Sequence, residues 1–284
     1  MKTAFVTDSG TGETIEQLRQ DGIYSVPLQV SYDHQNFNDS LDISIDEVYE
    51  KMREGKMLST SLPALGKIEE LFSQLKEDGY EQIFAVPICS GLSGTIDAMA
   101  MIAKQTGLAF EYVDCHVTAV VQGYLVRLAK QLMEKGKTVS EIKEACAKVI
   151  HTTDTLLLPD DLQHLKRGGR LTPLAATLGG LLKIKPVLAI NEQTKGKIDV
   201  IGKVRTMSKA MDTVIERMKQ DGVDSTYSIT VAHADAPEQA EVYRKKIETA
   251  LEGVQVQVIK LVSVVGVHTG RGCQALQYFK PYME

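Results

Sequence analysis

The chain has 284 residues, of which 43% are hydrophobic and 24% are charged, and its formal net charge is −5. This composition is typical of a packed globular protein and excludes wholesale disorder, while the acidic balance argues against a general nucleic-acid-binding protein. The length favours two domains over one.

The sequence also predicts a compartment. No apolar stretch approaches the length needed to span a bilayer, and Met1 to Asp8 reads as a strand entering a loop rather than as a signal peptide. The four cysteines lie far apart without paired spacing, which is typical of reduced thiols and gives no support for a metal site. A cytoplasmic protein without a bound metal is therefore expected.

The first half of the chain alternates strands and helices. Strands are expected at Lys2 to Thr7, Ile23 to Val30, Gln82 to Val86 and Phe110 to Asp114. Helices are expected at Glu13 to Asp21, Ile45 to Arg53, Ile68 to Leu75, from Ile96, from Thr118 to Lys135 and from Ser140, with a polar surface loop at Tyr32 to Leu41. This alternation predicts an α/β/α domain with a parallel, Rossmann-like sheet over residues 1–160.

Residues 87–95 join the end of a buried strand to the start of a helix. The first amides of a helix carry partial positive charge and have no internal partner, so an oxyanion can dock there. Gly91 and Gly94 permit close backbone approach, and three side chains offer hydroxyls: Ser90, Ser93 and Thr95. Because the loop has no lysine and no Walker or Rossmann glycine pattern, it suits a carboxylate better than a polyphosphate. The alternative is an ordinary turn whose serines cap the helix.

Three other polar groups stand at similar positions. Asp8 and Ser9 follow the first strand, where ligands collect in open α/β sheets, although capping of the next helix is the simpler and preferred explanation of Asp8. The run Ser59-Thr60-Ser61-Leu62-Pro63 supplies a second set of hydroxyls in a loop before a helix. His116 precedes another helix, where it is either a ligand group or merely tolerated.

The second half mixes two kinds of connection. Strands are expected at Thr155 to Leu158, Pro186 to Ile190, Lys197 to Val204, Ser228 to His233 and Val254 to Leu261. A helical turn is expected at Asp160 to Lys166, and helices at Thr206 to Asp221 and Pro237 to Leu251. The hairpin at residues 186–204 and the later strand–helix–strand unit together predict a second α/β domain, residues 161–284, with a mixed, partly antiparallel sheet.

Three features of this second domain point to ligands or partners. Leu171 to Leu182 is apolar but contains small residues and glycines, which favours close approach by a ligand or simple helix packing. Between Lys166 and Lys209 there are ten basic and two acidic residues, so this stretch carries a charge of +8 and the rest of the chain −13. Such an asymmetry can steer an anionic partner. Near the end, glycines surround His268, which can donate a hydrogen bond or, when charged, pair with a carboxylate.

Taken together, these motifs resemble the DegV family of bacterial fatty-acid-binding proteins, the acyl-carrying subunit of fatty acid kinase. The matching segments follow one another along nearly the whole chain: Thr7-Asp8-Ser9, Thr60-Ser61-Leu62-Pro63, Ser90-Gly91-Leu92-Ser93-Gly94-Thr95, Arg167-Gly168-Gly169-Arg170, Gly202-Lys203-Val204-Arg205-Thr206 and Gly266-Val267-His268-Thr269-Gly270. The resemblance implies a lipid-binding protein with two α/β domains that holds one long-chain fatty acid, such as hexadecanoate, in an apolar tunnel between them. It implies no cofactor and no catalysis by the chain itself.

The resemblance also implies roles for particular residues. Ser93, His268 and one of Thr60 and Ser61 would bind the fatty-acid carboxylate, supported by Gly94 and Thr95. Arg205 would contact the kinase subunit, which phosphorylates the carboxylate to an acyl phosphate for phospholipid synthesis, and transient contact with a membrane surface is compatible with that role. Four positions depart from the family pattern: Cys89, Cys115, Thr11-Gly12 and Arg271.

Two other functions compete with this one. A small-molecule kinase or transferase would use His268 or His116 as a catalytic group, but the sequence contains no nucleotide-binding motif. A DNA-binding regulator would need a helix-turn-helix pattern or a basic overall charge, and the sequence has neither.

Overall fold

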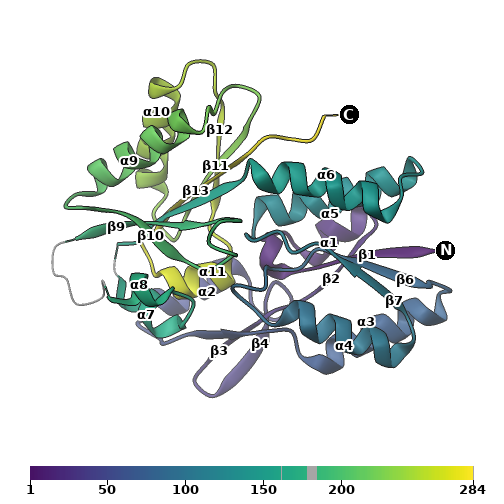
Figure 1. Ribbon diagram of the computed structural model, residues 1–284. Helices are drawn as coiled ribbons and strands as arrows, with labels where there is room; N and C mark the ends of the chain where they lie inside the picture. Colours follow the sequence, from purple (N-terminus) through teal and green to yellow (C-terminus); the bar gives the residue numbers. More distant parts are fainter. Residues whose placement is uncertain (161, 178–183, 284) are drawn as a thin grey trace. The chain divides into compact units, whose positions relative to one another are not determined.

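The computed structural model describes residues 1–160, 162–177 and 184–283 and divides into two compact units (Figure 1). The first unit comprises Met1–Lys148 with Val262–Val264, and the second comprises Val149–Leu261 with Val265–Glu284. The boundary expected at residue 160 falls within the second unit. One unit holds a parallel sheet and the other a mixed sheet, so the predicted fold class is confirmed.

The main sheet of the first unit has four parallel strands. Their order is β2 (Ile23–Val26), β1 (Thr3–Asp8), β6 (Gln82–Ala85) and β7 (Ala109–Tyr112). One face is covered by α3 (Leu65–Glu77) and α4 (Thr95–Thr106), and the other by α5 (Val120–Glu134) and α6 (Val139–His151) (Figure 1). Two shorter helices, α1 (Ile15–Gln20) and α2 (Ile45–Arg53), begin with capping boxes formed by Thr14 and Ser44.

The core of this unit follows from strand alternation. Ala4 and Val6 of β1 point to the same face of the sheet, because side chains two residues apart share a face. They pack in one apolar cluster with α3 and α4, whose apolar residues recur at helical spacing. The cluster includes Ile68, Phe72, Leu75, Met99 and Ile102.

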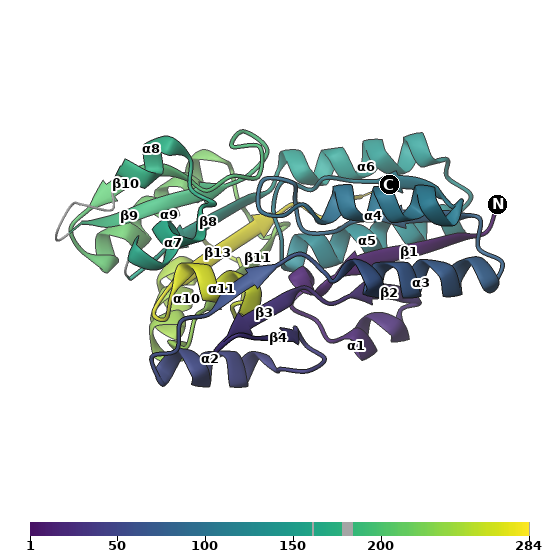
Figure 2. The same cartoon turned by 90° about the horizontal axis from the view of Figure 1, so that it is seen from below.

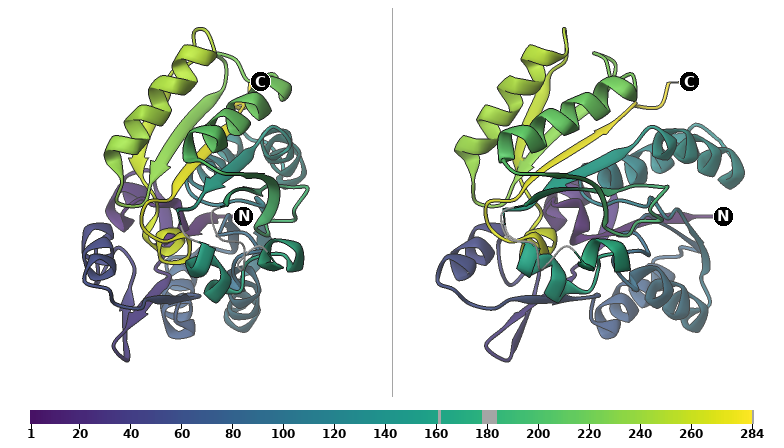
Figure 3. Two further views of the ribbon diagram at one scale, coloured as in Figure 1. Left: turned by 90° about the vertical axis from the view of Figure 1, so that its left-hand side faces the viewer. Right: turned by 60° about the vertical axis from the view of Figure 1, so that its left-hand side comes forward.

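A second, three-stranded sheet in this unit corrects two expectations. The strand expected from Ile23 to Val30 ends at Val26, because Pro27 lacks the amide needed to continue the ladder. The chain then forms β3 (Gln29–Tyr32) and β4 (Gln35–Asn38), a hairpin where a surface loop was expected (Figures 2 and 3). The expected hydroxyl loop at Ser59-Thr60-Ser61 is instead a strand, β5 (Ser59–Ser61), which pairs with β3.

The second unit is built on one mixed sheet. Its strands run in the order β10 (Asp199–Val204), β9 (Lys185–Ile190), β8 (Asp154–Leu158), β13 (Gln274–Phe279), β11 (Ser228–His233) and β12 (Val256–Lys260). Helices α9 (Met207–Gln220) and α10 (Pro237–Ala250) pack on one face through a continuous apolar cluster (Figure 1). The predicted hairpin of β9 and β10 and the predicted cap of α9 by Thr206 are both confirmed.

One helix and one strand of the second unit differ from expectation. The glycine-flanked segment around His268 is a helix, α11 (Ser263–Thr269), and the central strand β13 follows it without having been predicted. A further helix, α7 (Leu162–Gly168), follows β8, while α8 (Pro173–Ala176) begins the segment expected to be small and apolar. The rest of that segment, including Gly179 and Gly180, lies outside the described residues. Because β8 and β12 end where β13 starts, α7 and α11 lie at the same end of the sheet.

Candidate functional site

The amino end of α4 carries the hydroxyls on which the carboxylate hypothesis depends. Gly94 is the N-cap residue and no side chain caps the helix, so the serines are not caps, as the simpler alternative supposed. Ser93 is half-buried, and its hydroxyl oxygen lies 2.8 Å from that of fully buried Thr95. If Thr95 donates to Ser93, the Ser93 proton remains for a ligand beside the unpaired helix amides.

The end of β5 lies next to this helix start. A Cβ built on Gly94 would come within 3.8 Å of the Leu62 side chain, which follows β5 directly. Thr60 points to the face of β5 opposite Ser59 and Ser61, because side chains alternate along a strand. The Ser61 hydroxyl donates to the Gln29 side chain at 3.0 Å. Thr60 and Ser61, between which the sequence does not decide, therefore have different surroundings: Thr60 is half-buried and Ser61 is exposed.

Asp8 lies at the buried centre of the strand ends rather than at an open site. Its carboxylate accepts hydrogen bonds from the Gly10 amide, the Ile88 amide and the Gln122 side chain, at 2.8, 2.8 and 2.9 Å. It caps the short 3-10 helix η1 (Ser9–Thr11), whereas the helix that it was expected to cap, α1, is capped by Thr14. Burial raises the pKa of Asp8 to about 6, although these three donors act against the rise. Gln122, whose role the sequence did not indicate, joins α5 to this network.

A second buried acid, Asp39, also belongs to the first unit. It accepts a hydrogen bond from the hydroxyl of Ser263, one of the residues 262–264 that cluster with this unit. Burial raises the pKa of Asp39, and the Ser263 hydrogen bond opposes the rise. Ser9 is buried near these groups and its hydroxyl accepts from the Leu28 amide at 3.1 Å. Asp8 and Ser9 therefore organise the loops rather than face a ligand.

Asp114 holds the loop that precedes Ser93. Its carboxylate accepts from the Ser90 hydroxyl, and from the backbone amides of Ser90 at 3.4 Å and His116 at 3.2 Å. The His116 ring lies 3.7 Å from Asp114, and its backbone φ of +54° is the left-handed conformation that few side chains adopt. The sequence indicates Asp114 only as the end of a strand, yet its carboxylate joins the loops that follow β6 and β7.

His268 lies in the second unit, on α11. Burial, with a smaller contribution from the charge of Arg170, lowers the pKa of His268 to about 4. This shift favours the neutral imidazole, which can donate one hydrogen bond to a carboxylate. Arg271, which departs from the family pattern nearby, pairs with Asp235 at 2.8 Å.

Arg205 is exposed in the bend between β10 and α9. Lys203 and Lys209 on either side are also exposed, so the basic stretch presents at least these three cations to solvent. Other members of the stretch are engaged elsewhere: Lys185 pairs with Asp160. Lys183 lies outside the described residues.

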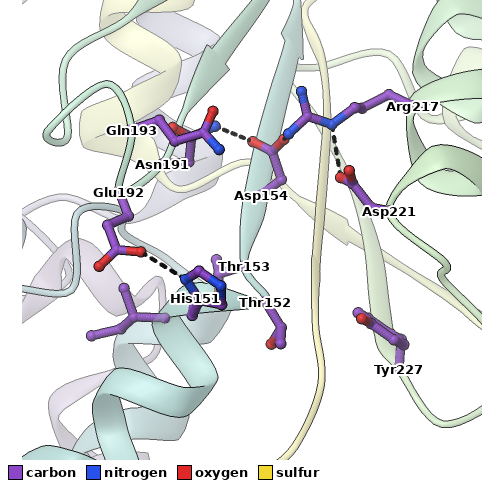
Figure 4. A pocket seen from close by; sticks show the side chains of 11 residues that line it. His151, Thr152, Thr153, Asp154, Asn191, Glu192, Gln193, Arg217, Asp221 and Tyr227 are labelled. Carbon is purple, nitrogen blue, oxygen red and sulfur yellow. Dashed lines mark hydrogen bonds and ion pairs between the residues drawn. The ribbon is translucent and has the colours of Figure 1, made fainter.

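A pocket of about 350 Å³ opens at the other end of the second unit's sheet (Figure 4). Its polar groups bind one another: Asp154 accepts from Asn191 at 2.9 Å and lies 3.2 Å from Arg217, which donates to Asp221 at 2.8 Å. His151 and Glu192 form a further pair at 3.3 Å on the rim. Because an acyl chain would lie against these buried and paired charges, this pocket does not suit a fatty-acid tail.

Across residues 1–160, 162–177 and 184–283, no group of three or more His, Cys, Asp or Glu side chains is arranged to hold a metal ion. Within the same ranges, none of the helices combines the length and apolar character that crossing a membrane requires.

Comparison with known proteins gives a family match along almost the entire chain. The family model described as "Uncharacterised protein, DegV family" matches residues 2–281. A DegV domain-containing protein of Streptococcus pneumoniae is 34% identical over 280 residues, covering 98% of this chain and 99% of that protein. Another, from Listeria innocua, is 32% identical over 286 residues, covering 98% of each chain.

Solved structures agree with these relatives. A protein from Streptococcus agalactiae, described as a fatty acid binding DegV family protein, superimposes with a TM-score of 0.87 at 28% identity and covers 98% of this chain and 99% of its own. DegV from Bacillus subtilis, described as a fatty acid binding protein, gives a TM-score of 0.85 at 26% identity and covers 99% of both chains.

Proposed function

The chain belongs to the DegV family, and we propose on that basis that it is a carrier that binds one long-chain fatty acid without catalysing a reaction itself. One observation in the structure supports this most directly. The amino end of α4 has no side-chain cap and instead presents the Ser93 hydroxyl backed by Thr95. Such a group of neutral donors suits a carboxylate head group, and two family members with solved structures are fatty-acid-binding proteins.

We propose that Ser93, Thr60 and His268 each donate a hydrogen bond to the carboxylate. Thr60 is preferred over Ser61 because Thr60 lies on the half-buried face of β5, whereas Ser61 is exposed. Gly94 leaves the first amides of α4 accessible, and Thr95 orients the Ser93 hydroxyl. None of these donors carries a charge at neutral pH, because His268 has a pKa of about 4.

Neutral donors fit a carboxylate that must later react. A strong ion pair would hold the carboxylate firmly and oppose its phosphorylation, whereas hydrogen bonds from hydroxyls orient it at lower cost. Affinity comes from the tail instead: at about 0.8 kcal/mol per buried methylene, a hexadecanoate chain supplies roughly 11 kcal/mol before ordering costs are subtracted. The tail therefore supplies most of the affinity, and the head-group residues supply the orientation and a smaller share of the affinity.

We further propose that the partner is the catalytic subunit of a fatty acid kinase. In this scheme the kinase phosphorylates the bound carboxylate to an acyl phosphate, which then enters phospholipid synthesis. The exposed cations Lys203, Arg205 and Lys209 support a contact with an acidic surface on that subunit. Arg205 is the residue that we expect to matter most, because its planar guanidinium can bind a carboxylate in a bidentate manner.

The binding proposal can be tested on the purified chain. Denaturation followed by lipid extraction and mass spectrometry is expected to release a fatty acid. After delipidation, hexadecanoate should bind more tightly than hexadecanol, which has the same tail without the carboxylate. A chain that carries no lipid and binds neither compound would contradict the proposed function.

Variants test the head-group residues separately. Ser93→Ala and Thr60→Val are each expected to lower hexadecanoate affinity about tenfold or more, because each removes one hydrogen bond to a charged acceptor. Ser59→Ala is the matched control, since Ser59 lies on the opposite face of β5 from Thr60, and its affinity should not change. Isothermal titration of delipidated protein measures all three. Equal affinities for Thr60→Val and wild type would assign the contact to another residue.

The partner proposal needs a separate experiment. Arg205→Glu is expected to abolish phosphorylation of the bound acid by the kinase subunit while leaving hexadecanoate affinity unchanged. Lys245→Glu, a charge reversal at an exposed position on α10, should leave both properties intact. If both variants support phosphorylation equally, Arg205 does not contact the kinase.

A further inference from the structure

Two glycines and two histidines of the second unit fit together across α7 and α11. A Cβ built on Gly168, the last residue of α7, would lie 2.5 Å from Nδ1 and 3.3 Å from Cγ of His268 on α11. A Cβ built on Gly270, just after α11, would lie 2.7 Å from Cδ2 of His164 on α7. Each histidine ring therefore occupies the space where the other helix has no side chain.

At Gly168, space rather than backbone conformation requires glycine. Gly169 and Gly270 have φ values of +69° and +79°, which side-chain-bearing residues rarely adopt, but Gly168 is not among the residues with positive φ. An alanine in a helix is favoured over glycine by about 1 kcal/mol, so the helix itself would be more stable with alanine. The imidazole of His268 is the group that an alanine methyl would displace.

We propose that Gly168 is a positioning residue for His268, because the close contact of the ring with the end of α7 fixes the direction in which the imidazole donates its hydrogen bond. The reciprocal contact of His164 with Gly270 fixes the end of α11 against α7. Helix α11 therefore cannot shift and carry the His268 ring with it. This inference rests on the proposed function, in which His268 donates a hydrogen bond to the carboxylate. It gives the Arg167-Gly168-Gly169-Arg170 motif the role of orienting that histidine.

The main test is Gly168→Ala. Its affinity for hexadecanoate is expected to fall about tenfold, close to the loss in His268→Ala, because the methyl group turns the imidazole away. Its affinity for hexadecanol should be unchanged, because a merely structural defect would weaken both ligands alike. Gly66→Ala is the matched control: Gly66 also lies inside a helix, α3, with nothing within 4 Å of a Cβ at that position, so this variant should bind both ligands normally.

A double variant tests the contact between Gly168 and His268 directly. It also keeps the proposal testable if Gly168→Ala alone does not fold. Gly168→Ala with His268→Ala removes the clash, so its melting temperature should exceed that of Gly168→Ala. Its hexadecanoate affinity should equal that of His268→Ala alone, because the two changes remove the same interaction. Additive losses in the double variant would overturn the proposal, as would wild-type affinity for hexadecanoate in Gly168→Ala.

Failure of this inference is distinguishable from failure of the proposed function. A wild-type chain that binds hexadecanoate, with a His268→Ala variant that binds it equally well, would overturn the positioning role and leave the carrier function intact. NMR of the ligand-free protein adds an independent readout: the His268 ring signals are expected to move in Gly168→Ala and to stay in place in Gly66→Ala. Unmoved ring signals in Gly168→Ala would also overturn it.

Discussion

Burial changes the acidity of His268 and Asp8 in opposite senses. It disfavours the charged form of each group, so the pKa of His268 falls to about 4 and the pKa of Asp8 rises to about 6. The two groups belong to different units, and each unit therefore responds differently when the pH falls. His268 is the more useful probe, because it is also a proposed head-group ligand.

The first prediction concerns acid sensitivity. Because the folded pKa of His268 lies below its unfolded value of 6.5, its contribution to stability is present above pH 6.5 and is lost as the pH falls toward 4. A shift of this size corresponds to about 3 kcal/mol. His268→Gln should remove this part of the acid destabilisation, as measured by denaturant unfolding at pH 7 and pH 4. An NMR titration that gives His268 a pKa near 6.5 would contradict it.

A second prediction concerns Asp114, which joins the Ser90 loop to the His116 loop. Asp114→Ala should cost about 1–3 kcal/mol of stability, because it leaves two backbone amides and a hydroxyl without their acceptor. Hexadecanoate affinity should also fall, since the loop carries Ser93. Glu111→Ala is the control: Glu111 lies on β7, three residues before Asp114, and its side chain forms a surface ion pair with Lys143, worth about 0–1 kcal/mol. Thermal unfolding and titration distinguish the two variants.

At the scale of elements, the sequence predicted what local periodicity determines. The bounds of α2 and β11 agree with those expected, and the hairpin of β9 and β10 was predicted from its polar turn. Helix α11 and strand β13 were missed because their identity depends on partners far along the chain: β13 is buried between β8 and β11. A glycine-rich segment gives little local signal for such an arrangement.

In the candidate site, too, some features follow from the local sequence and others from tertiary contacts. The composition of the loop before α4 was sufficient to propose a carboxylate site, because helix amides and hydroxyls are local properties. Which hydroxyl of residues 59–61 is half-buried depends on β5 pairing with β3, a tertiary arrangement that distinguishes Thr60 from Ser61. The lowered pKa of His268 likewise follows from burial, which no sequence motif encodes.

The β3–β4 hairpin permits a third prediction. Its two-residue loop, Asp33 and His34, has φ values of +49° and +62°, the conformation that glycine and asparagine prefer. His34→Gly should therefore stabilise the first unit by about 0.5–1 kcal/mol, because it relieves left-handed strain. Gln35→Gly, inside β4, should have the opposite effect. Differential scanning calorimetry measures both, and a lower melting temperature for His34→Gly would contradict this account of the turn.

For the whole molecule, the distribution of charge is the informative property. The net charge of −5 conceals a basic stretch, residues 166–209, in an otherwise acidic chain. An acidic partner would be attracted to the exposed cations of that stretch over a range of about 10 Å at moderate ionic strength. An uncharged acyl tail experiences no such attraction.

A fourth prediction follows for the proposed kinase contact. The association rate between the loaded carrier and the kinase subunit should fall about tenfold or more as salt rises from about 50 mM to about 500 mM, while hexadecanoate affinity changes little. Stopped-flow measurements on wild type and Arg205→Glu would show a steep salt dependence only in the wild type. A salt-independent association rate in the wild type would exclude electrostatic steering.

All four cysteines are buried thiols that form no disulfide, and burial raises the thiol pKa values of Cys115, Cys146 and Cys273 to about 12. Because the thiolate is the reactive form, iodoacetamide should modify the native chain very slowly at pH 7. The Cys89 carbonyl accepts hydrogen bonds from the amides of Leu92 and Ser93, in the turn that precedes α4. The rate at which Cys89 is alkylated would therefore measure how often this turn opens. The alkylation rate of Cys89 therefore reports local opening of the chain, and a bound ligand that rigidifies this turn should lower that rate.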